Sequence, residues 1–254
     1  MSFSDKARLF AALHVKGRPL VLTNIWDAGS AKAVADAGAH AIATSSWSMA
    51  AAQGFADGEA MPFDLVEEIV GRIAKTADLP LTVDIEGGYA VEPDEMADNI
   101  ERIVSAGAVG TNLEDGVIGG SGLHNTTLQC RRLKAIRTRV ARHGIDLFIN
   151  ARTDLFLQAG DSARHAGLLD PAIERAHAYA DAGASGFFAP GLADERLIEA
   201  LCGAVRLPVN VMVGGDAPST NRLGELGVSR ISYGPMPYIH CMQHLKLQAS
   251  PANR

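Results

Sequence analysis

The chain has 254 residues and a mass of 26.7 kDa, a length that suits one large domain and is typical of an eight-stranded β/α barrel. Its 23 basic and 29 acidic residues give a formal net charge of −6, which argues against a protein that binds nucleic acid or anionic membranes. Hydrophobic residues make up 47% of the chain and charged residues 20%, which is enough apolar material for a core and too little charge for disorder.

The sequence shows no sign of a membrane span, a leader or a disulfide framework. No apolar run approaches the roughly 18 residues that cross a bilayer. The segment Met1–Lys6 lacks the basic and apolar regions of a signal peptide. Cys130, Cys202 and Cys241 are odd in number and have no C-x-x-C spacing. We therefore expect a soluble cytoplasmic protein with no nucleic-acid and no membrane partner.

Short apolar or β-branched runs alternate with longer amphipathic stretches along the whole chain. We predict eight strands, at residues 20–23, 40–44, 81–85, 108–113, 146–151, 185–189, 209–213 and 228–232. Most of these runs are continuously apolar rather than alternating, as in strands that are buried on both faces.

The connections between these strands indicate how they are arranged. The second, fourth, sixth and eighth strands each follow a glycine that ends a predicted helix, which is typical of an αβ loop: Gly38, Gly107, Gly183 and Gly227. Eight βα units without a linker predict an α/β fold with one domain over residues 1–254, a single closed (β/α)8 TIM barrel with an N-terminal helix. A doubly wound open sheet is the structural alternative.

Acidic residues follow two neighbouring predicted strands, where a barrel carries its active-site face. Asp84 and Glu86 are two residues apart on one strand, so both side chains point to the same face. Glu114 lies at the matching end of the next strand. Carboxylates at one level repel one another unless a cation lies among them, and all-oxygen ligation suits Mg²⁺ or Mn²⁺. Solvated strand-end charges are the alternative interpretation.

Other polar residues follow the fifth and second strands. The fork of Arg152 suits bidentate binding of a substrate carboxylate or phosphoryl group, and a structural ion pair to Glu114 or Asp154 is a compatible alternative. Hydroxyl and backbone N–H groups that can cradle a carboxylate or an oxyanion follow the second strand, at Ser45, Ser46 and Trp47. A serine nucleophile is disfavoured, because no histidine follows a strand in a triad-like place. The glycine-rich stretch 116–125 predicts a mobile loop over the site.

With these residues in place, the chain resembles the phosphoenolpyruvate mutase and isocitrate lyase superfamily from about Phe10 to Pro235. The matching stretches are Leu-Thr-Asn-Ile-Trp-Asp-Ala-Gly-Ser at 22–30, Asp-Ile-Glu-Gly-Gly-Tyr at 84–89, Asn-Leu-Glu-Asp at 112–115 and Ala-Arg-Thr-Asp at 151–154. No single stretch is decisive, but four of them in order on barrel units are a strong match.

The resemblance implies a (β/α)8 barrel, Mg²⁺, a 2-oxo or 2-hydroxy acid substrate that reacts through an enolate, and a homo-oligomer, either a dimer or a tetramer. By resemblance, Asp84 is the direct metal ligand, and Glu86 and Glu114 act through metal-bound water. Asp57 matches an aspartate near the metal, and Asn210 matches a polar position that lines the pocket.

The resemblance also assigns the substrate-binding and catalytic roles. Ser45, Ser46 and Trp47 would cradle the substrate carboxylate, and Arg152 would bind the reacting end. Arg152, Asp57 and Ser45 are the expected catalytic residues.

The chain departs from the family in its loop after strand four. The carbon–carbon lyases carry Lys-Lys-Cys-Gly-His there, and the cysteine acts as a general acid. Here residues 116–129 contain neither cysteine nor lysine, and Cys130 is predicted to begin a helix, so cleavage of isocitrate or methylisocitrate by that route is not expected. The family's Asp-x-Asp is Asp84-x-Glu86 here. The chain stops soon after the last strand, and we expect the C-terminal helix exchange of some family dimers to be absent.

We therefore expect a Mg²⁺-dependent lyase or mutase-type enzyme that breaks a C–C or P–C bond in a small 2-oxo or 2-hydroxy acid. Oxaloacetate decarboxylation or phosphonopyruvate cleavage is favoured, because neither needs the missing cysteine. Two alternatives remain open. One is a Mg²⁺-dependent aldolase or acyl lyase that acts on a longer hydroxy acid, and the other is a metabolite-binding protein without turnover.

Overall fold

Nine short strand segments form one parallel sheet in the computed structural model, which describes residues 1–214 and 218–250. The segments are β1 (Leu20–Leu22), β2 (Asn24–Ile25), β3 (Ile42–Thr44), β4 (Leu81–Asp84), β5 (Gly110–Glu114), β6 (Phe148–Arg152), β7 (Gly186–Phe188), β8 (Val209–Met212) and β9 (Arg230–Ser232). Their order in the sheet is β1-β9-β8-β7-β6-β5-β4-β3-β2.

The sheet closes on itself through its first strand, which is interrupted at Thr23. The half before the break, β1, pairs with β9, and the half after it, β2, pairs with β3. The two halves therefore count as one barrel strand, and the closed eight-stranded barrel predicted from the sequence is confirmed. The open doubly wound sheet is excluded, because such a sheet has two unpaired edges.

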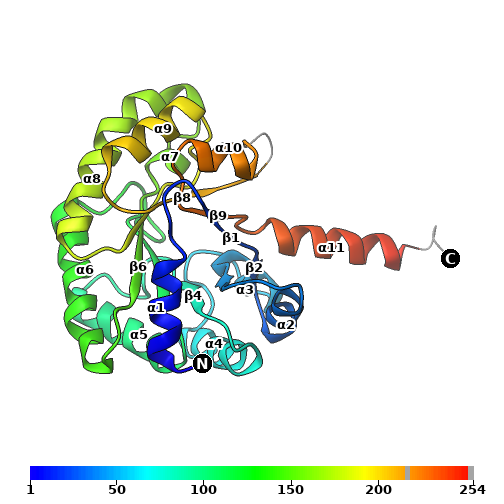
Figure 1. The fold of residues 1–254 in the computed structure, drawn as a ribbon. Helices are drawn as coiled ribbons and strands as arrows, with labels where there is room; N and C mark the ends of the chain where they lie inside the picture. The colour runs from blue at the N-terminus through cyan, green and yellow to red at the C-terminus, as the bar shows by residue number, and fades with distance from the viewer. Residues whose placement is uncertain (215–217, 251–254) are drawn as a thin grey trace.

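Helices connect the strands, and most of them lie around the outside of the barrel (Figure 1). They are α1 (Phe3–Ala12), α2 (Ala28–Asp36), α3 (Ser46–Ala52), α4 (Phe63–Thr76), α5 (Pro93–Ser105), α6 (Thr126–Val140), α7 (Leu155–Gln158), α8 (Leu169–Asp181), α9 (Glu195–Ala204), α10 (Thr220–Glu225) and α11 (Met236–Ala249), with 3₁₀ turns η1 (Ala141–His143) and η2 (Ser162–Leu168). The four predicted helix-ending glycines have φ values of 88°, 119°, 101° and 92°, so the left-handed caps are confirmed.

The N-terminal helix α1 contributes to the core at the amino ends of the strands. Phe10 is fully buried in a small cluster with Leu20, Leu22 and Phe148. Its ring lies so close to the start of β5 that a β-carbon on Gly110 would come within 2.7 Å of it. The opposite, carboxyl end of the barrel is therefore the end that is left open for a site.

The C-terminal helix α11 differs from the others because it extends away from the barrel (Figure 1). None of its residues is buried. Only its beginning is anchored by aromatic contacts, since Tyr238 packs edge-on against Trp26 and Trp47 with ring centroids 5.1 and 6.0 Å apart. A substantial helix thus follows the last strand.

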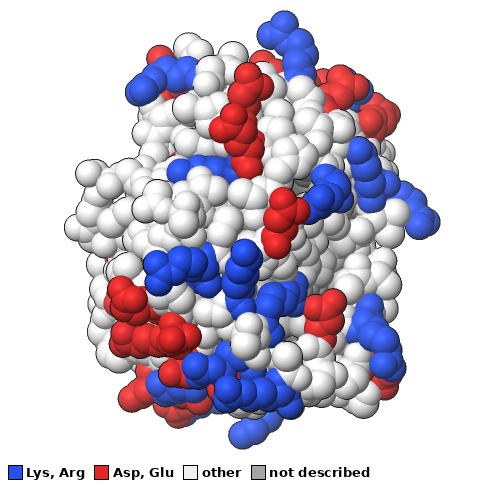
Figure 2. Space-filling model, turned by 90° about the vertical axis from the view of Figure 1, so that its left-hand side faces the viewer, with Lys and Arg blue, Asp and Glu red and all other residues white. Residues whose placement is uncertain are grey.

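The charged surface is mixed. On the face drawn in Figure 2, Lys and Arg side chains lie among Asp and Glu side chains. Within residues 1–214 and 218–250, no helix combines the length and the apolar character that crossing a bilayer requires.

Candidate active site

A cavity of about 160 Å³ lies at the carboxyl end of the barrel strands. Six of the residues singled out in the sequence line it: Ser45, Ser46, Trp47, Asp57, Asp84 and Arg152. The remaining wall is formed by Asn24, Asn112, Leu157, Phe188, Pro190, Met212, Ser232, Gly234 and Pro235. Strand ends and the connections after them therefore bring together residues that are far apart in the sequence, as the barrel prediction required.

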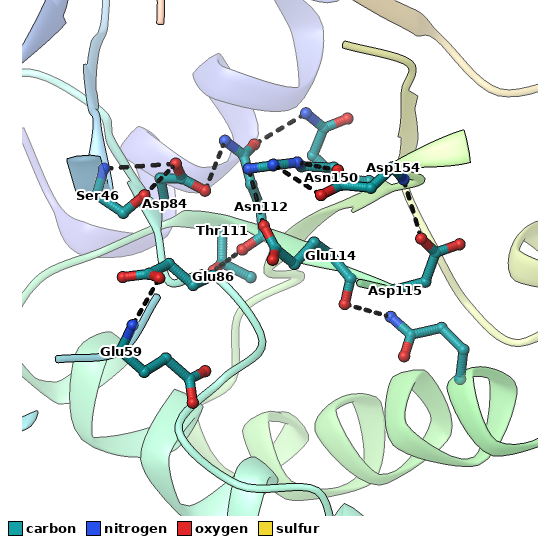
Figure 3. A network of polar contacts seen from close by, with 12 residues as sticks. Ser46, Glu59, Asp84, Glu86, Thr111, Asn112, Glu114, Asp115, Asn150 and Asp154 are labelled. Atoms are coloured by element: carbon teal, nitrogen blue, oxygen red, sulfur yellow. Dashed lines mark hydrogen bonds and ion pairs between the residues drawn. The ribbon is translucent and has the colours of Figure 1, made fainter. Parts of the chain in front are cut away.

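Asp84 ends β4 and is held from two sides (Figure 3). Ser46 at the start of α3 donates its hydroxyl to Asp84 Oδ2 at 2.9 Å, and the amide of Asn112 lies 3.5 Å from Oδ1. The backbone N–H of Asp84 donates to the hydroxyl of Thr44 at 2.9 Å. These contacts fix the carboxylate in one orientation at the cavity wall.

Ser45 lines the cavity and also caps the helix that follows it. It is the N-cap of α3, and its side chain accepts hydrogen bonds from the N–H and the hydroxyl of Ser48. The backbone N–H of Ser45 donates to the carbonyl of Ile25. The capped N-terminus of α3 therefore faces the cavity, with Ser46 and Trp47 in its first turn.

Glu86 lies behind the cavity wall rather than in it. Its Oε2 accepts a hydrogen bond of 2.7 Å from the backbone N–H of Glu59, and Glu59 Oε1 accepts one of 2.7 Å from the N–H of Tyr89. All three residues have left-handed φ values, of 53°, 60° and 57°. Burial, reinforced by the nearby Asp57, raises the pKa of Glu86 to about 7.

We call this arrangement of Glu59, Glu86 and Tyr89 the carboxylate clamp. It ties the connection that carries Asp57 to the connection that follows β4. Sequence reasoning missed Glu59, although the stretch Asp57-Gly58-Glu59 offered a signal, an acidic pair around a glycine in a loop. Burial raises the pKa of Glu59, and burial together with Asp84 raises that of Asp57.

Arg152, at the end of β6, bridges two buried carboxylates. Its Nε and Nη2 donate to the two oxygens of Asp154 at 2.6 and 3.0 Å, and its Nη1 lies 2.9 Å from Glu114 Oε2. The structural ion pair foreseen from the sequence is therefore present with both partners. Burial alone would lower the pKa of Arg152, but Glu114 and Asp154 raise it above its ordinary value.

Burial also changes the pKa of one carboxylate that Arg152 bridges, and a buried neighbour positions the other. Burial raises the pKa of Glu114 to about 8, with Arg152 opposing the shift. Asp154 is placed by Asp115, which is fully buried and accepts the backbone N–H of Asp154 at 3.0 Å. Asp115 is in turn held by the hydroxyl of Tyr179 at 2.7 Å.

Polar side chains also fill the barrel interior below the cavity. Asn150 donates to Asn112 Oδ1 at 2.9 Å and to Asn210 Oδ1 at 3.0 Å, and Arg230 donates to Asn112 Oδ1 at 3.2 Å. The expectation that Asn210 lines the pocket is therefore wrong. Its side chain is buried in this interior layer, and Met212, two residues further along β8, takes the place on the wall.

The loop 116–125 is folded on itself beside the site. Gly116 and Leu123 form an antiparallel bridge, and the side chain of Gln158 donates to the carbonyl of Gly122 at 3.1 Å. Its residues line a neighbouring pocket of about 180 Å³ next to the carboxylate clamp, not the main cavity. Cys130 lies in a helix, as predicted, but does not begin it, because α6 starts at Thr126, where Asn125 caps the first turn.

Comparison with known proteins identifies the family of this chain. A family model described as phosphoenolpyruvate phosphomutase matches residues 10–252. The chain belongs to the phosphoenolpyruvate mutase/isocitrate lyase superfamily. It is 34% identical to an uncharacterized protein of Mycobacterium tuberculosis, over 94% of this chain and 83% of that protein. It is 29% identical to the 2-methylisocitrate lyase of Escherichia coli K12, over 92% and 79% of the two chains.

Solved structures agree with this superfamily assignment. A crystal structure from Burkholderia cenocepacia J2315, of a protein named only by inference as a phosphonomutase, has a TM-score of 0.94 and 47% identity and covers 97% of this chain and 98% of its own. A phosphonopyruvate hydrolase solved with oxalate and Mg²⁺ shares the fold, with a TM-score of 0.80 and 19% identity over 95% and 84% of the two chains.

The donor set fits a Mg²⁺ ion that one carboxylate and water molecules hold. Among the described residues, no three Asp, Glu, His or Cys side chains are arranged to ligate one ion together. Asp84, Glu86 and Glu114 are therefore not three direct ligands of one ion: Glu86 accepts the backbone N–H of Glu59, and Glu114 pairs with Arg152. The water-mediated roles that the resemblance implies for the two glutamates stay predictions. Asp84 alone of the three lines the cavity, and it is the residue that would hold the ion directly.

Proposed function

We propose that this superfamily member is a Mg²⁺-dependent lyase or mutase-type enzyme that breaks a C–C or P–C bond in a small 2-oxo or 2-hydroxy acid through an enolate. The observation that carries the proposal is the place of Asp84, which is oriented by Ser46 and Asn112 in a cavity beside Arg152. The family assignment supports it, since enzymes such as 2-methylisocitrate lyase belong to the same superfamily.

Bound at Asp84, Mg²⁺ would supply Lewis-acid stabilisation of the negative charge that develops on the substrate. The chain itself orients the reactants. The first turn of α3, with Ser46 and Trp47, faces the place of the substrate carboxylate, and helix N-termini favour negative charge. Arg152, fixed by Glu114 and Asp154, points its remaining N–H groups at the reacting end.

Glu86 and Glu114 act at a distance from the cavity. Both would assist through water molecules on the ion, since neither lines the cavity. The side chains that line the described cavity include neither lysine nor cysteine, so a proton donor of the kind found in the carbon–carbon lyases is absent from it. This favours reactions that need no such donor, including decarboxylation of oxaloacetate and cleavage of phosphonopyruvate.

The test combines metal binding with turnover. Asp84→Asn keeps the shape of the side chain and removes its charge. We expect calorimetry to show at least a tenfold weaker affinity of this variant for Mg²⁺. We also expect its rate of pyruvate release from oxaloacetate and from phosphonopyruvate to fall by two orders of magnitude or more. The uncatalysed rate with free Mg²⁺ is subtracted. Asp36→Asn is the matched control, because Asp36 is 64% exposed in a surface ion pair with Lys32. Unchanged metal affinity in Asp84→Asn would refute the site.

A further inference from the structure

Arg230 is a fully buried cation in the barrel interior. It lies in β9 with 1% of its surface exposed, within the polar layer beneath the cavity. Its Nη2 donates to Asn112 Oδ1 at 3.2 Å, whereas its Nε and Nη1 have no hydrogen-bond partner among the described residues. The ring of Phe10 lies 5.9 Å from the guanidinium carbon, at the outer limit of a cation–π contact. In the part of the chain that the structure describes, no carboxylate pairs with this guanidinium.

Other buried arginines near the site have acceptors that compensate their charge. Arg152 bridges the carboxylates of Glu114 and Asp154. Arg132 donates to two backbone carbonyls. Replacing a buried ionic group by an apolar side chain of similar volume is often neutral or stabilising. Packing alone therefore does not explain a cation at position 230.

A single side chain separates Arg230 from the cavity. Asn112 lines the cavity, and its amide lies between Arg230 and Asp84, with Nδ2 3.5 Å from Asp84 Oδ1 (Figure 3). Asn150 also donates to Asn112 Oδ1, at 2.9 Å. Because Asn150 alone keeps the amide oxygen turned away from Asp84, an apolar side chain in place of Arg230 removes a charge without releasing Asn112.

The charge of Arg230 is felt at the carboxyl end of the barrel. Burial lowers the pKa of Arg230 to about 9, and the negative charge of Asp84 opposes this shift. The guanidinium therefore stays charged at neutral pH. A charge in a poorly hydrated interior acts over several ångströms with little screening. It acts in opposite directions on the two species that the proposed function brings to the cavity, since it attracts an anionic acid and repels Mg²⁺.

We propose that Arg230 is a buried counter-charge for the substrate, which favours binding of the anionic 2-oxo or 2-hydroxy acid from beneath the cavity without touching it. Because it acts across Asn112, it is a positioning residue and not a catalytic one. This inference rests on the proposed function and adds a residue to the same site. Arg230 belongs neither to the cavity wall nor to the four stretches that resemble the superfamily.

The test measures two affinities of the full chain by calorimetry, one for Mg²⁺ alone and one for oxalate at saturating Mg²⁺. Arg230→Met replaces the cation by an apolar side chain. We expect it to weaken oxalate binding at least about fivefold, because a unit charge in a poorly hydrated interior contributes at least that factor over several ångströms. Its affinity for Mg²⁺ alone should stay equal or rise. A smaller loss for oxalate, or a fall in both affinities, would overturn the inference.

The charge of the ligand supplies a second signature. Oxalate carries two negative charges and pyruvate carries one. The loss of affinity in Arg230→Met should be larger for oxalate than for pyruvate, because the Coulomb energy is proportional to the charge of the ligand. Equal losses for the two anions would indicate a packing defect and would contradict the inference.

A second variant separates the charge of Arg230 from its hydrogen bond. Arg230→Gln keeps an N–H group for Asn112 and has no charge, so it should lose oxalate affinity as Arg230→Met does. It serves for the same comparison if Arg230→Met does not fold. Arg196→Gln is the matched control, because it removes a positive charge whose side chain is 92% exposed, and its oxalate affinity should stay within twofold. Wild-type oxalate affinity in Arg230→Gln would assign the effect to the hydrogen bond and overturn the inference.

The wild-type chain separates this inference from the function on which it rests. If oxalate does not bind to the wild-type chain in the presence of Mg²⁺, the proposed function fails and the role of Arg230 fails with it. If oxalate binds equally well to the wild-type chain and to Arg230→Met, the proposed function stands and only the role of Arg230 is overturned.

Discussion

Arg152 compensates two buried carboxylates at once, and this role is separate from any contact with substrate. Glu114 and Asp154 are both buried, and Arg152 reaches them from opposite ends of its guanidinium. The loss of one partner from a buried ionic group leaves the others uncompensated in a poorly hydrated place, which costs far more than the loss of a surface pair.

We expect Arg152→Met to lower the free energy of unfolding by about 3–5 kcal/mol at pH 8. Arg152→Lys should lower it less, because an ammonium keeps the charge but cannot pair with both carboxylates at once. Urea denaturation followed by circular dichroism measures both. A loss below about 1 kcal/mol in Arg152→Met would show that the site tolerates the unpaired carboxylates.

His14 is the group whose burial makes the fold sensitive to acid. It is stacked on Phe148 with ring centroids 3.9 Å apart, and its Nδ1 lies 2.7 Å from the carbonyl oxygen of Phe10. Burial, and then the positive charge of Arg230, lowers the pKa of His14 from 6.5 to about 3. Between these two values the unfolded chain binds a proton that the folded chain does not, so stability is present above pH 6.5 and is lost as the pH falls toward 3.

The prediction is that His14→Leu flattens the fall in stability below pH 6.5, while the wild-type chain loses up to about 1.4 kcal/mol per pH unit from this group. Unfolding free energies at pH 7, 6 and 5 measure the slope. His143→Leu is the control, because His143 is partly exposed and pairs with Glu101 at the surface. Parallel slopes for wild type and His14→Leu would contradict the assignment.

At the scale of elements, the carboxylate clamp holds two connections together. Glu59 lies between α3 and α4, and Glu86 and Tyr89 lie between β4 and α5. Left-handed backbone at residues other than glycine costs of order 1 kcal/mol or more each, and such conformations persist where surrounding contacts over-determine them. Here the contacts are the two charge-assisted hydrogen bonds between the connections.

We expect Glu59→Gly to release the second connection, because glycine keeps the left-handed backbone and loses only the carboxylate that accepts the N–H of Tyr89. Hydrogen exchange of the Tyr89 amide should quicken at least tenfold, and affinity for Mg²⁺ should fall as the Asp57 and Asp84 connections separate. Glu59→Gln keeps an acceptor oxygen and should retain slow exchange. Fast exchange in wild type would show that the clamp does not hold.

The strands and helices show which features of the fold and the site could be predicted from the sequence and which could not. The strands and their glycine-capped helices were predictable because buried parallel strands are continuous apolar runs, and Asp84 followed because it ends one. Asn210 lies within a strand, where both faces are buried and the sequence does not tell an interior side chain from a wall side chain. Glu59 follows no strand, so only the three-dimensional arrangement places it, and Asp57 was reached by resemblance alone.

At the scale of the whole molecule, α11 is anchored to the barrel near its beginning, where Tyr238 packs against Trp26 and Trp47, and extends away from it beyond that point (Figure 1). Its exposed apolar side chains include Met242, at 37% exposure, and Leu245, at 60%. The resemblance to the superfamily implied a homo-oligomer, and the sequence led us to expect no C-terminal helix exchange. Because α11 extends from the barrel with no buried residue, we propose instead that the protein is a homo-oligomer in which α11 packs against another copy. Light scattering after size exclusion should give a mass of two or more chains. Met242→Glu with Leu245→Glu should shift it to one chain, and a wild-type monomer would refute the proposal.

The interruption at Thr23 divides the first barrel strand between its two neighbours, and one of them, β9, is the last strand of the barrel. A ribosome synthesises Leu20 long before Arg230, its partner in the sheet. Until Arg230 is made, the nascent chain has an open sheet edge, which is a template for wrong strand pairing. Asn112, which lies beneath Asp84, also lacks the hydrogen bond that Arg230 donates to it in the folded protein. The first barrel strand is thus paired on both sides only after the last barrel strand has been made, and the end of the barrel that carries the candidate site is completed at that point.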